Sequence, residues 1–300
     1  MKKLHYISFN IPNQVGSRLR SALSRLGCEQ WWQPPPTERG LPSFENTFDS
    51  QDPRLCQVRN LAASEGIRVF ERVEHVYTPA ELRAVPLLEF SVELAPRDLG
   101  DAYVEQYDLS TGCPHCRTGA RQVRSVRVTP EFDDGESGFP RKGMICQSVD
   151  FDYFVRGDLH VTLAAADLSG LEFMEALSAT NTPLGWWQLI ARHVLPRMSP
   201  ETCGIIRERN KDGQGCHHCD RDNYFHTTAE PSQITYHRSE LGSRPLPDIA
   251  YTWECFGQSC FDRNRYIARP RVLVSPKVFD IFRKQKIRAA RFVPVQIIDD

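Results

Sequence analysis

The chain has 300 residues, of which 40% are hydrophobic and 25% charged, and its formal net charge is −1. With a mean hydropathy of −0.45, this composition is typical of a globular protein of one or two domains with ample apolar material for a core. No segment approaches the run of about 18 apolar residues that a membrane span needs. A near-neutral chain also has no global field that would attract nucleic acid or an anionic membrane, so we expect no membrane partner and nucleic acid only through a local basic patch.

The first hundred residues predict an N-terminal α+β domain. Leu4 to Phe9 is typical of an opening strand. The helix that follows has apolar residues spaced for one buried face and ends at Gly27, and a second helix, over residues 54–65, ends at Gly66. Between them, the run 31–36 contains three prolines in succession and predicts irregular structure, since proline has no amide donor.

A short helix and a strand complete this domain. Thr78-Pro79-Ala80-Glu81 places a capping residue, a first-turn proline and a glutamate three positions after the cap, which predicts a helix N-terminus. Residues 88–94 then alternate apolar and polar side chains, the period expected of a strand with one buried face. We place the N-terminal α+β domain at residues 1–110 and a second α+β domain at 111–300.

Two Cys-x-x-Cys pairs carry the clearest chemistry in the second domain. Each pair follows a glycine, Gly112 or Gly215, which suits a tight loop in which two thiolates three residues apart face one ion. Four thiolates are the ligand set that a structural zinc ion takes tetrahedrally. We therefore predict one structural Zn²⁺ ion, bound by Cys113, Cys116, Cys216 and Cys219.

The ten cysteines leave alternatives open. No signal peptide follows Met1, so we expect a cytoplasmic, reducing compartment, where paired cysteines are more often metal ligands than disulfides. Redox pairs and unliganded core cysteines are the alternatives. Cys255 and Cys260 are spaced too widely for the usual zinc loop, and a second metal site there would need His226 and His237 as helpers.

The sequence predicts that the second domain contains the same structural unit twice. Val155 and Val274 lie 119 positions apart, and the same shift aligns the apolar residues of two strand-helix-strand patterns, over 154–173 and 273–292. The two cysteine pairs are offset by 103, so an insertion of about 16 residues, held in a loop-like stretch over 220–248, would reconcile the offsets. Chance convergence of two short apolar patterns is the alternative.

From residue 112 to 295 the chain resembles the bacterial double-CxxCG-motif proteins. The resemblance rests on the two cysteine pairs, on the segment 273–279 and on the closing segment 290–295. Arg117 and Asp220 replace the glycine after each pair, but that glycine serves the turn and is not a ligand. The family is similar to immunity proteins that protect a producer from its own toxin. The resemblance thus implies a non-catalytic protein with a cognate protein toxin as partner.

Other functional classes have weaker sequence support. The chain has no His-Glu-x-x-His, Walker A, Gly-x-Ser-x-Gly or zinc-deaminase motif, so we predict no catalytic residues. His217 and His218 lie inside the second cysteine pair, where we expect them to face solvent, with a ligand exchange for a cysteine as the alternative. An acidic cluster could face a basic toxin. The main rival is a zinc-ribbon nucleic-acid-binding protein. The acidic cluster comprises Glu131, Asp133, Asp134 and Glu136, and the basic residues favouring the rival are Arg117, Arg121, Arg124, Arg127, Arg283, Lys284, Lys286, Arg288 and Arg291.

Overall fold

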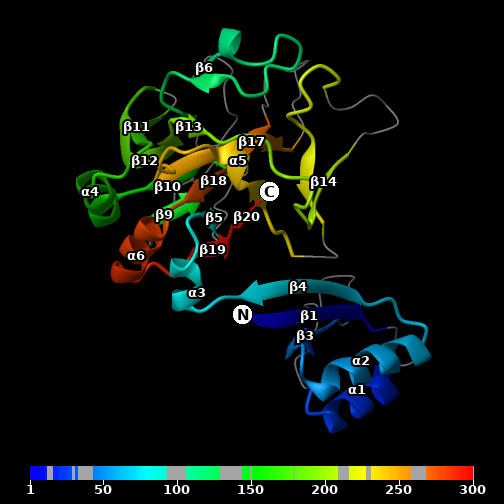
Figure 1. Ribbon diagram of the computed structural model, residues 1–300. Helices are drawn as coiled ribbons and strands as arrows, with labels where there is room; N and C mark the ends of the chain where they lie inside the picture. The colour runs from blue at the N-terminus through cyan, green and yellow to red at the C-terminus, as the bar shows by residue number, and fades with distance from the viewer. Residues whose placement is uncertain are drawn as a thin grey trace. The chain divides into compact units, whose positions relative to one another are not determined.

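The computed structural model describes residues 1–11, 16–28, 31–32, 43–92, 106–128, 144–148, 151–178, 180–208, 216–227, 231–257 and 268–299. The chain divides into two compact units. The first comprises Met1–Thr78 with Thr227–Ser232, and the second comprises Pro79–His226 with Gln233–Asp300. Helices and strands occur together in both, which confirms the predicted α+β class (Figure 1). None of the helices in the described part of the chain has the length and apolar character that a membrane crossing requires.

The first unit is a four-stranded antiparallel sheet with two helices. Its strands lie in the order β2-β3-β1-β4, with β1 paired to both β3 and β4. The chain order βαββαβ with this strand order is the ferredoxin-like arrangement, in which each helix connects two strands across a third. The elements are β1 (Lys2–Asn10), α1 (Gly16–Arg25), β2 (Trp31–Trp32), β3 (Ser43–Asp49), α2 (Pro53–Ser64) and β4 (Phe70–Val76).

A single apolar core holds the first unit together. Alternate residues of β1 and β3 meet the apolar stripes of α1 and α2, so the helices lie against one face of the sheet. Gly27 and Gly66 have φ of 68° and 67°, the left-handed conformation predicted for the residues that end the two helices. Trp31–Trp32 forms β2, paired with β3, so the prediction of irregular structure was wrong at these two residues. The core comprises Ile7, Phe9, Ile11, Leu19, Leu23, Cys28, Phe44, Phe48, Leu55, Val58 and Ala62.

The second unit contains two larger sheets. The five-stranded sheet has the order β8-β11-β12-β10-β9 and comprises β8 (Arg127–Val128), β9 (Ile145–Gln147), β10 (Tyr153–Val155), β11 (Leu171–Ser178) and β12 (Pro183–Ala191). The seven-stranded sheet runs β14-β15-β17-β18-β5-β19, with β13 on β17. It comprises β5 (Leu88–Val92), β13 (His193–Val194), β14 (Ile205–Arg207), β15 (Tyr224–His226), β17 (Ile249–Phe256), β18 (Arg269–Val274) and β19 (Ala290–Pro294).

The other elements described in the second unit are two small strand pairs, the 3-10 helix η2 (Leu109–Thr111) and four α-helices. The strand pairs are β6 (Tyr107–Asp108) with β7 (Arg121–Gln122), and β16 (Thr235–His237) with β20 (Gln296–Ile298). The α-helices are α3 (Pro79–Arg83), α4 (Gly157–Ala165), α5 (Arg238–Leu241) and α6 (Pro276–Lys284). Because β15, β16 and α5 fall within residues 220–248, the stretch predicted to be loop-like is partly regular.

Both predicted strand-helix-strand units are present, as β10-α4-β11 and β18-α6-β19. Val155 and Val274, which the 119-residue shift aligns, are both buried in the first strand of their unit. Asp167 and Lys286, also related by this shift, follow the two helices with φ of 48° and 57°. Left-handed backbone at non-glycine residues is uncommon, so its recurrence at matching positions supports a duplication.

Each strand-helix-strand unit has a central strand that comes from elsewhere in the chain. β12 lies between β10 and β11 and is antiparallel to both, while β5 lies between β18 and β19 in the same way. In sequence, β5 precedes the first cysteine pair and β12 precedes the second. If each repeat consists of a strand, a cysteine pair and a strand-helix-strand unit, each repeat supplies the central strand of the other.

The surroundings of β5 account for two differences between the predicted and the observed fold. The boundary expected at residues 110 and 111 lies inside the second unit, since β5 pairs with β18 and β19 near the end of the chain. The strand over β5 was predicted to bury one face, but Glu89 on the other face is also buried, because Leu273, its partner on β18, belongs to a buried cluster with Tyr236 and Val295. The Glu89 carboxylate lies 3.8 Å from Nε2 of His226.

Candidate metal centre

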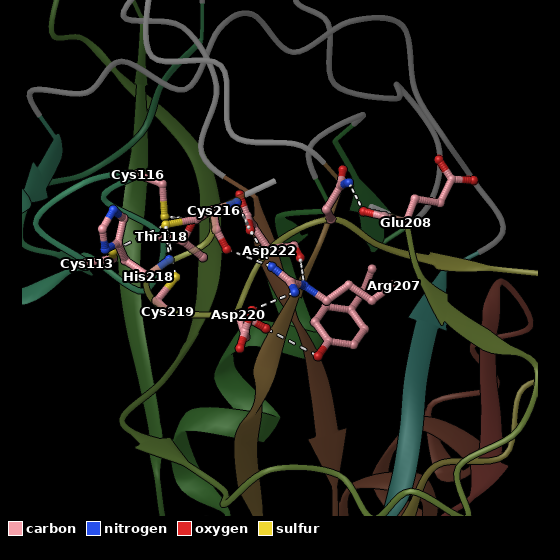
Figure 2. Close-up of polar contacts among 12 residues, drawn as sticks. Cys113, Cys116, Thr118, Arg207, Glu208, Cys216, His218, Cys219, Asp220 and Asp222 are labelled. Carbon is pink, nitrogen blue, oxygen red and sulfur yellow. Dashed lines mark hydrogen bonds and ion pairs between the residues drawn. The ribbon is translucent and has the colours of Figure 1, made fainter. Parts of the chain in front are cut away.

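The structure brings the four predicted cysteines together. Their sulfur atoms all lie within 4.8 Å of one another, although the two pairs come from loops more than 100 residues apart (Figure 2). The Sγ atoms of Cys113 and Cys216 are 3.7 Å apart, and those of Cys116 and Cys219 are 3.5 Å apart. A disulfide requires about 2.05 Å. The four thiols are therefore arranged around a common point and could hold a metal ion.

Cysteines that the 103-residue offset relates lie opposite one another. Cys113 faces Cys216 and Cys116 faces Cys219, and each pair is separated by 103 residues. The imidazole rings of His115 and His218, which the same offset relates, stack with centroids 3.4 Å apart and an interplanar angle of 12°. Both rings are exposed, as is His217, and none belongs to the four-residue cluster. This agrees with the expectation that His217 and His218 face solvent.

Backbone conformation shapes each loop around its thiols. A side chain at Gly112 would place its Cβ 2.3 Å from the carbonyl oxygen of Arg117, so only glycine fits there. Arg117 and Asp220, where the resembling family has glycine, adopt φ of 58° and 55°. Both loops thus retain the left-handed turn that glycine would favour, and the substitutions leave the four thiols in place. Gly215 lies outside the described residues.

The environment of the thiols differs from one cysteine to the next. Burial by itself raises the pKa of Cys113, but hydrogen bonds from the backbone amides of Cys116 and His115 outweigh it and lower the pKa to about 7. Burial raises the pKa of Cys116 to about 11 and also raises that of Cys219. Burying several thiolates together is unfavourable unless a cation neutralises them, which is the electrostatic role that a bound metal ion would fill.

Arg207 holds the second cysteine loop from β14. Its Nη1 donates to Oδ1 of Asp220 at 2.6 Å, its Nη2 donates to the carbonyl of Cys216 at 2.8 Å, and its Nε donates to the carbonyl of Asp222 at 3.1 Å (Figure 2). Asp222 in turn accepts a hydrogen bond from the amide of Cys216 at 3.0 Å. Sequence reasoning missed this network, because Arg207 has no spacing relation to the cysteines that would have drawn attention to it.

The first loop is held differently. The amide of Cys113 donates to the carbonyl of Thr118 at 3.0 Å, and the amide of Arg117 donates to the carbonyl of Cys113 at 2.8 Å. The Thr118 hydroxyl lies 3.2 Å from Sγ of Cys116, and Thr118 is fully buried. The first loop is therefore closed by its own backbone, whereas the second depends on a side chain from a neighbouring strand.

The described residues among the other potential ligands do not gather into a second centre. Within the described residues, the four cysteines form the only cluster of three or more potential metal ligands. Cys255 is buried, His226 stacks on Phe256 with ring centroids 5.0 Å apart, and Nε2 of His237 lies 3.3 Å from a carboxylate oxygen of Glu201. Cys260 lies outside the described residues, as does the acidic cluster of Glu131, Asp133, Asp134 and Glu136.

The sequence was compared with known families and with individual curated proteins. No family model matches the chain. No curated protein matches it either.

Proposed function

We propose that the four cysteines bind one structural zinc ion. A tetrahedral site with Zn–S bonds of about 2.3 Å has sulfur atoms about 3.8 Å apart, close to the separations of 3.7 and 3.5 Å between the facing cysteines. A catalytic zinc ion has three protein ligands and an open position for water, whereas four thiolates complete the shell. The role of the ion is thus to join two loops, and elemental analysis should find one zinc per chain.

We infer further that the protein acts by binding and not by catalysis, as an immunity-like protein that neutralises a cognate protein toxin. The resemblance of the cysteine pairs and C-terminal segments to double-CxxCG-motif proteins supports this function. The closed set of four thiolates carries the argument from the site, since a metal that serves only to hold the fold suits a protein whose activity is stoichiometric binding.

The test is protection of cells that express a toxin encoded next to this gene. Co-expression should restore growth, and the purified proteins should form a complex of defined stoichiometry. Cys113→Ser should reduce protection only in proportion to the loss of folded protein. By contrast, Asp133→Asn with Asp134→Asn should slow association and leave stability unchanged, because charges at the rim of an interface chiefly set the association rate. Protection that persists after the chain is unfolded, or turnover of the toxin, contradicts this function.

A zinc-supported nucleic-acid-binding function is the second candidate, favoured by a cluster of exposed basic side chains. Arg283 and Lys284 end α6, and Lys286 and Arg288 follow it, all four exposed. Titration with duplex and single-stranded DNA at two salt concentrations separates the candidates. Tight binding that falls steeply with salt and is lost in Arg288→Gln would favour nucleic acid over the toxin.

A further inference from the structure

The second unit contains a cavity of about 510 Å³ close to the candidate metal centre. Its walls come from β10 and β12 of the five-stranded sheet, from β17 and β18 of the seven-stranded sheet, and from the segments that follow the two cysteine pairs. Pockets of about 300–1,000 Å³ with mostly apolar walls and a few convergent polar groups are typical of small-molecule sites. Four aromatic rings line this one, those of Tyr107, Phe151, Tyr153 and Tyr251.

More of the charged side chains that line the cavity are positive than negative. Four arginines line it against two carboxylates, those of Asp152 and Glu172. Arg192 forms a bidentate pair with Glu172, with nitrogen–oxygen distances of 3.0 and 2.8 Å. The lining therefore has a formal surplus of two positive charges, which matches the charge of a phosphomonoester dianion. The four arginines are Arg121, Arg192, Arg221 and Arg269.

Arg221 is fixed at the wall between the cavity and the second cysteine loop. Its Nε donates to the carbonyl of Trp253 at 3.0 Å, and its guanidinium lies over the Trp253 ring, 5.1 Å from the centroid. A Cβ atom at Gly119, which has φ of +81°, would lie 2.1 Å from Nη1 of Arg221. Glycine at 119 thus leaves the space that this guanidinium occupies, and a fork held in place loses little entropy when it binds an anion.

The inner part of the cavity is polar and buried. Arg269 is 6% exposed, its guanidinium lies 4.4 Å from the centroid of the Tyr107 ring, and its Nη2 lies 3.7 Å from Oδ2 of Asp152. The other oxygen of Asp152 accepts a hydrogen bond from Nε2 of Gln188 at 3.0 Å. Burial raises the pKa of Asp152, and the nearby Arg269 opposes this effect. A carboxyl and a guanidinium held in this way can bind hydroxyl or amino groups of a ring system.

We propose that this cavity binds a small organic phosphate with a ring-bearing body, of the size of a nucleoside monophosphate. The phosphate would pair with Arg121 and Arg221, since guanidinium forks match phosphate oxygens bidentately. The ring would lie among the tyrosines, next to Asp152 and Arg269. The proposal does not depend on the toxin-binding function or on which metal the cysteines hold.

Calorimetric titration of the full-length, metal-loaded protein tests the proposal, with adenosine 5′-monophosphate and phenyl phosphate as probes. At least one should bind saturably with Kd below about 1 mM. Adenosine, which has the ring but no phosphate, should bind at least tenfold more weakly than its monophosphate. Arg221→Met should weaken binding at least tenfold, and Arg121→Met, at an exposed residue of β7, is a second variant with little risk to folding.

Arg197→Met is the matched control. The Arg197 guanidinium also lies over the Trp253 ring, 4.1 Å from the centroid, but Arg197 does not line the cavity. The change removes the same charge and the same kind of ring contact as Arg221→Met, so binding should stay within twofold of the unaltered protein. Absence of saturable binding by both probes, equal affinity for adenosine, or equal weakening by Arg197→Met and Arg221→Met would overturn the proposal.

Discussion

The two units of this protein reach a closed fold by different routes. In the first, consecutive elements within residues 2–76 form a complete sheet, and one apolar core closes it. In the second, β5 lies between β18 and β19, and the thiols of Cys113 and Cys216 meet across the two repeats. The first unit therefore needs only burial of its amphipathic helices, whereas the second must also bring together segments that lie far apart in the chain.

A metal ion would contribute most to the second unit. Joining distant segments has a chain-entropy cost that grows slowly with loop length, and a bond across a long loop offsets more of it than one across a short loop. Because β5 lies between β18 and β19 and β12 lies between β10 and β11, each of these strand groups needs a strand from elsewhere in the chain to complete its sheet. A metal ion between the cysteine loops would hold the two repeats in one register.

The largest expected effect comes from replacing a single cysteine of the candidate metal centre, in either loop. Cys113→Ser and Cys216→Ser should each unfold the second unit and leave the first intact, because binding of a structural zinc ion contributes about 10–16 kcal/mol in zinc-finger peptides and a whole domain is stable by about 5–15 kcal/mol. Hydrogen exchange resolved by peptide should show protection lost over β17 and β18 and retained over β1. Cys203→Ser, at an exposed cysteine of the second unit, is the control and should change neither. Equal loss of protection in both units would contradict the comparison.

A smaller effect should follow from a large-to-small substitution in the core of each unit. Phe9 in β1 is 2% exposed and Phe282 in α6 is 1% exposed, so Phe9→Ala and Phe282→Ala should each reduce the free energy of unfolding by about 3–5 kcal/mol. Phe9→Ala should raise exchange only in the first unit and leave metal content unchanged. If amides of β17 exchange faster in Phe9→Ala, the two units do not unfold independently.

Acid should weaken a contact between the two repeats. Asp248 accepts hydrogen bonds from the Ser169 amide and hydroxyl at 2.9 and 3.0 Å and from the Ser275 hydroxyl at 2.7 Å. Burial by itself raises the pKa of Asp248, but these hydrogen bonds outweigh it and lower the pKa below its usual value. Because the folded-state pKa is the lower one, the stabilisation is complete above the unfolded-state pKa of about 4 and is lost as pH falls through the folded-state value.

Asp248→Asn should therefore reduce the free energy of unfolding by about 1–3 kcal/mol at pH 7 and remove part of its dependence on pH below about 4. Urea unfolding of the metal-loaded protein, followed at pH 7 and at pH 3.5, gives both quantities. A variant whose pH dependence matches that of the unaltered protein would rule out this role for Asp248.

The smallest expected effect distinguishes the two cysteine loops. Arg117→Gly should raise the free energy of unfolding by about 0.5–1 kcal/mol, because a left-handed conformation is strained for arginine and not for glycine. Asp220→Gly relieves the same strain but removes the ion pair with Arg207, whose side chain is 14% exposed, so it should be destabilising. Thermal unfolding of both variants at saturating zinc measures the difference. A gain in both variants would mean that the Arg207 pair contributes less than the strain that glycine relieves.

Local signals were enough to predict much of the fold. The opening strand, both helices of the first unit and the two strand-helix-strand units follow from apolar periodicity and helix-ending glycines, since these depend on neighbours a few residues apart. The four cysteines of the candidate metal centre also follow from spacing, because two thiols three residues apart share one loop. Among the positions that the 119-residue shift aligns, three pairs are buried in both segments: Val155 and Val274, Leu159 and Val278, and Leu163 and Phe282.

What only the tertiary structure decided is how these pieces pair. The strand β5 was predicted with one buried face because periodicity cannot show that Tyr236 and Val295, from distant segments, pack in the cluster that covers the face of Glu89. Likewise the sequence does not place Arg207 behind the second cysteine loop, or Arg221 and Arg269 in one cavity. Such contacts join residues with no fixed separation in the chain. The sequence by itself therefore determined the elements and the paired cysteines, and the pairing of strands far apart in the chain decided the domain boundary and which residues line the cavity.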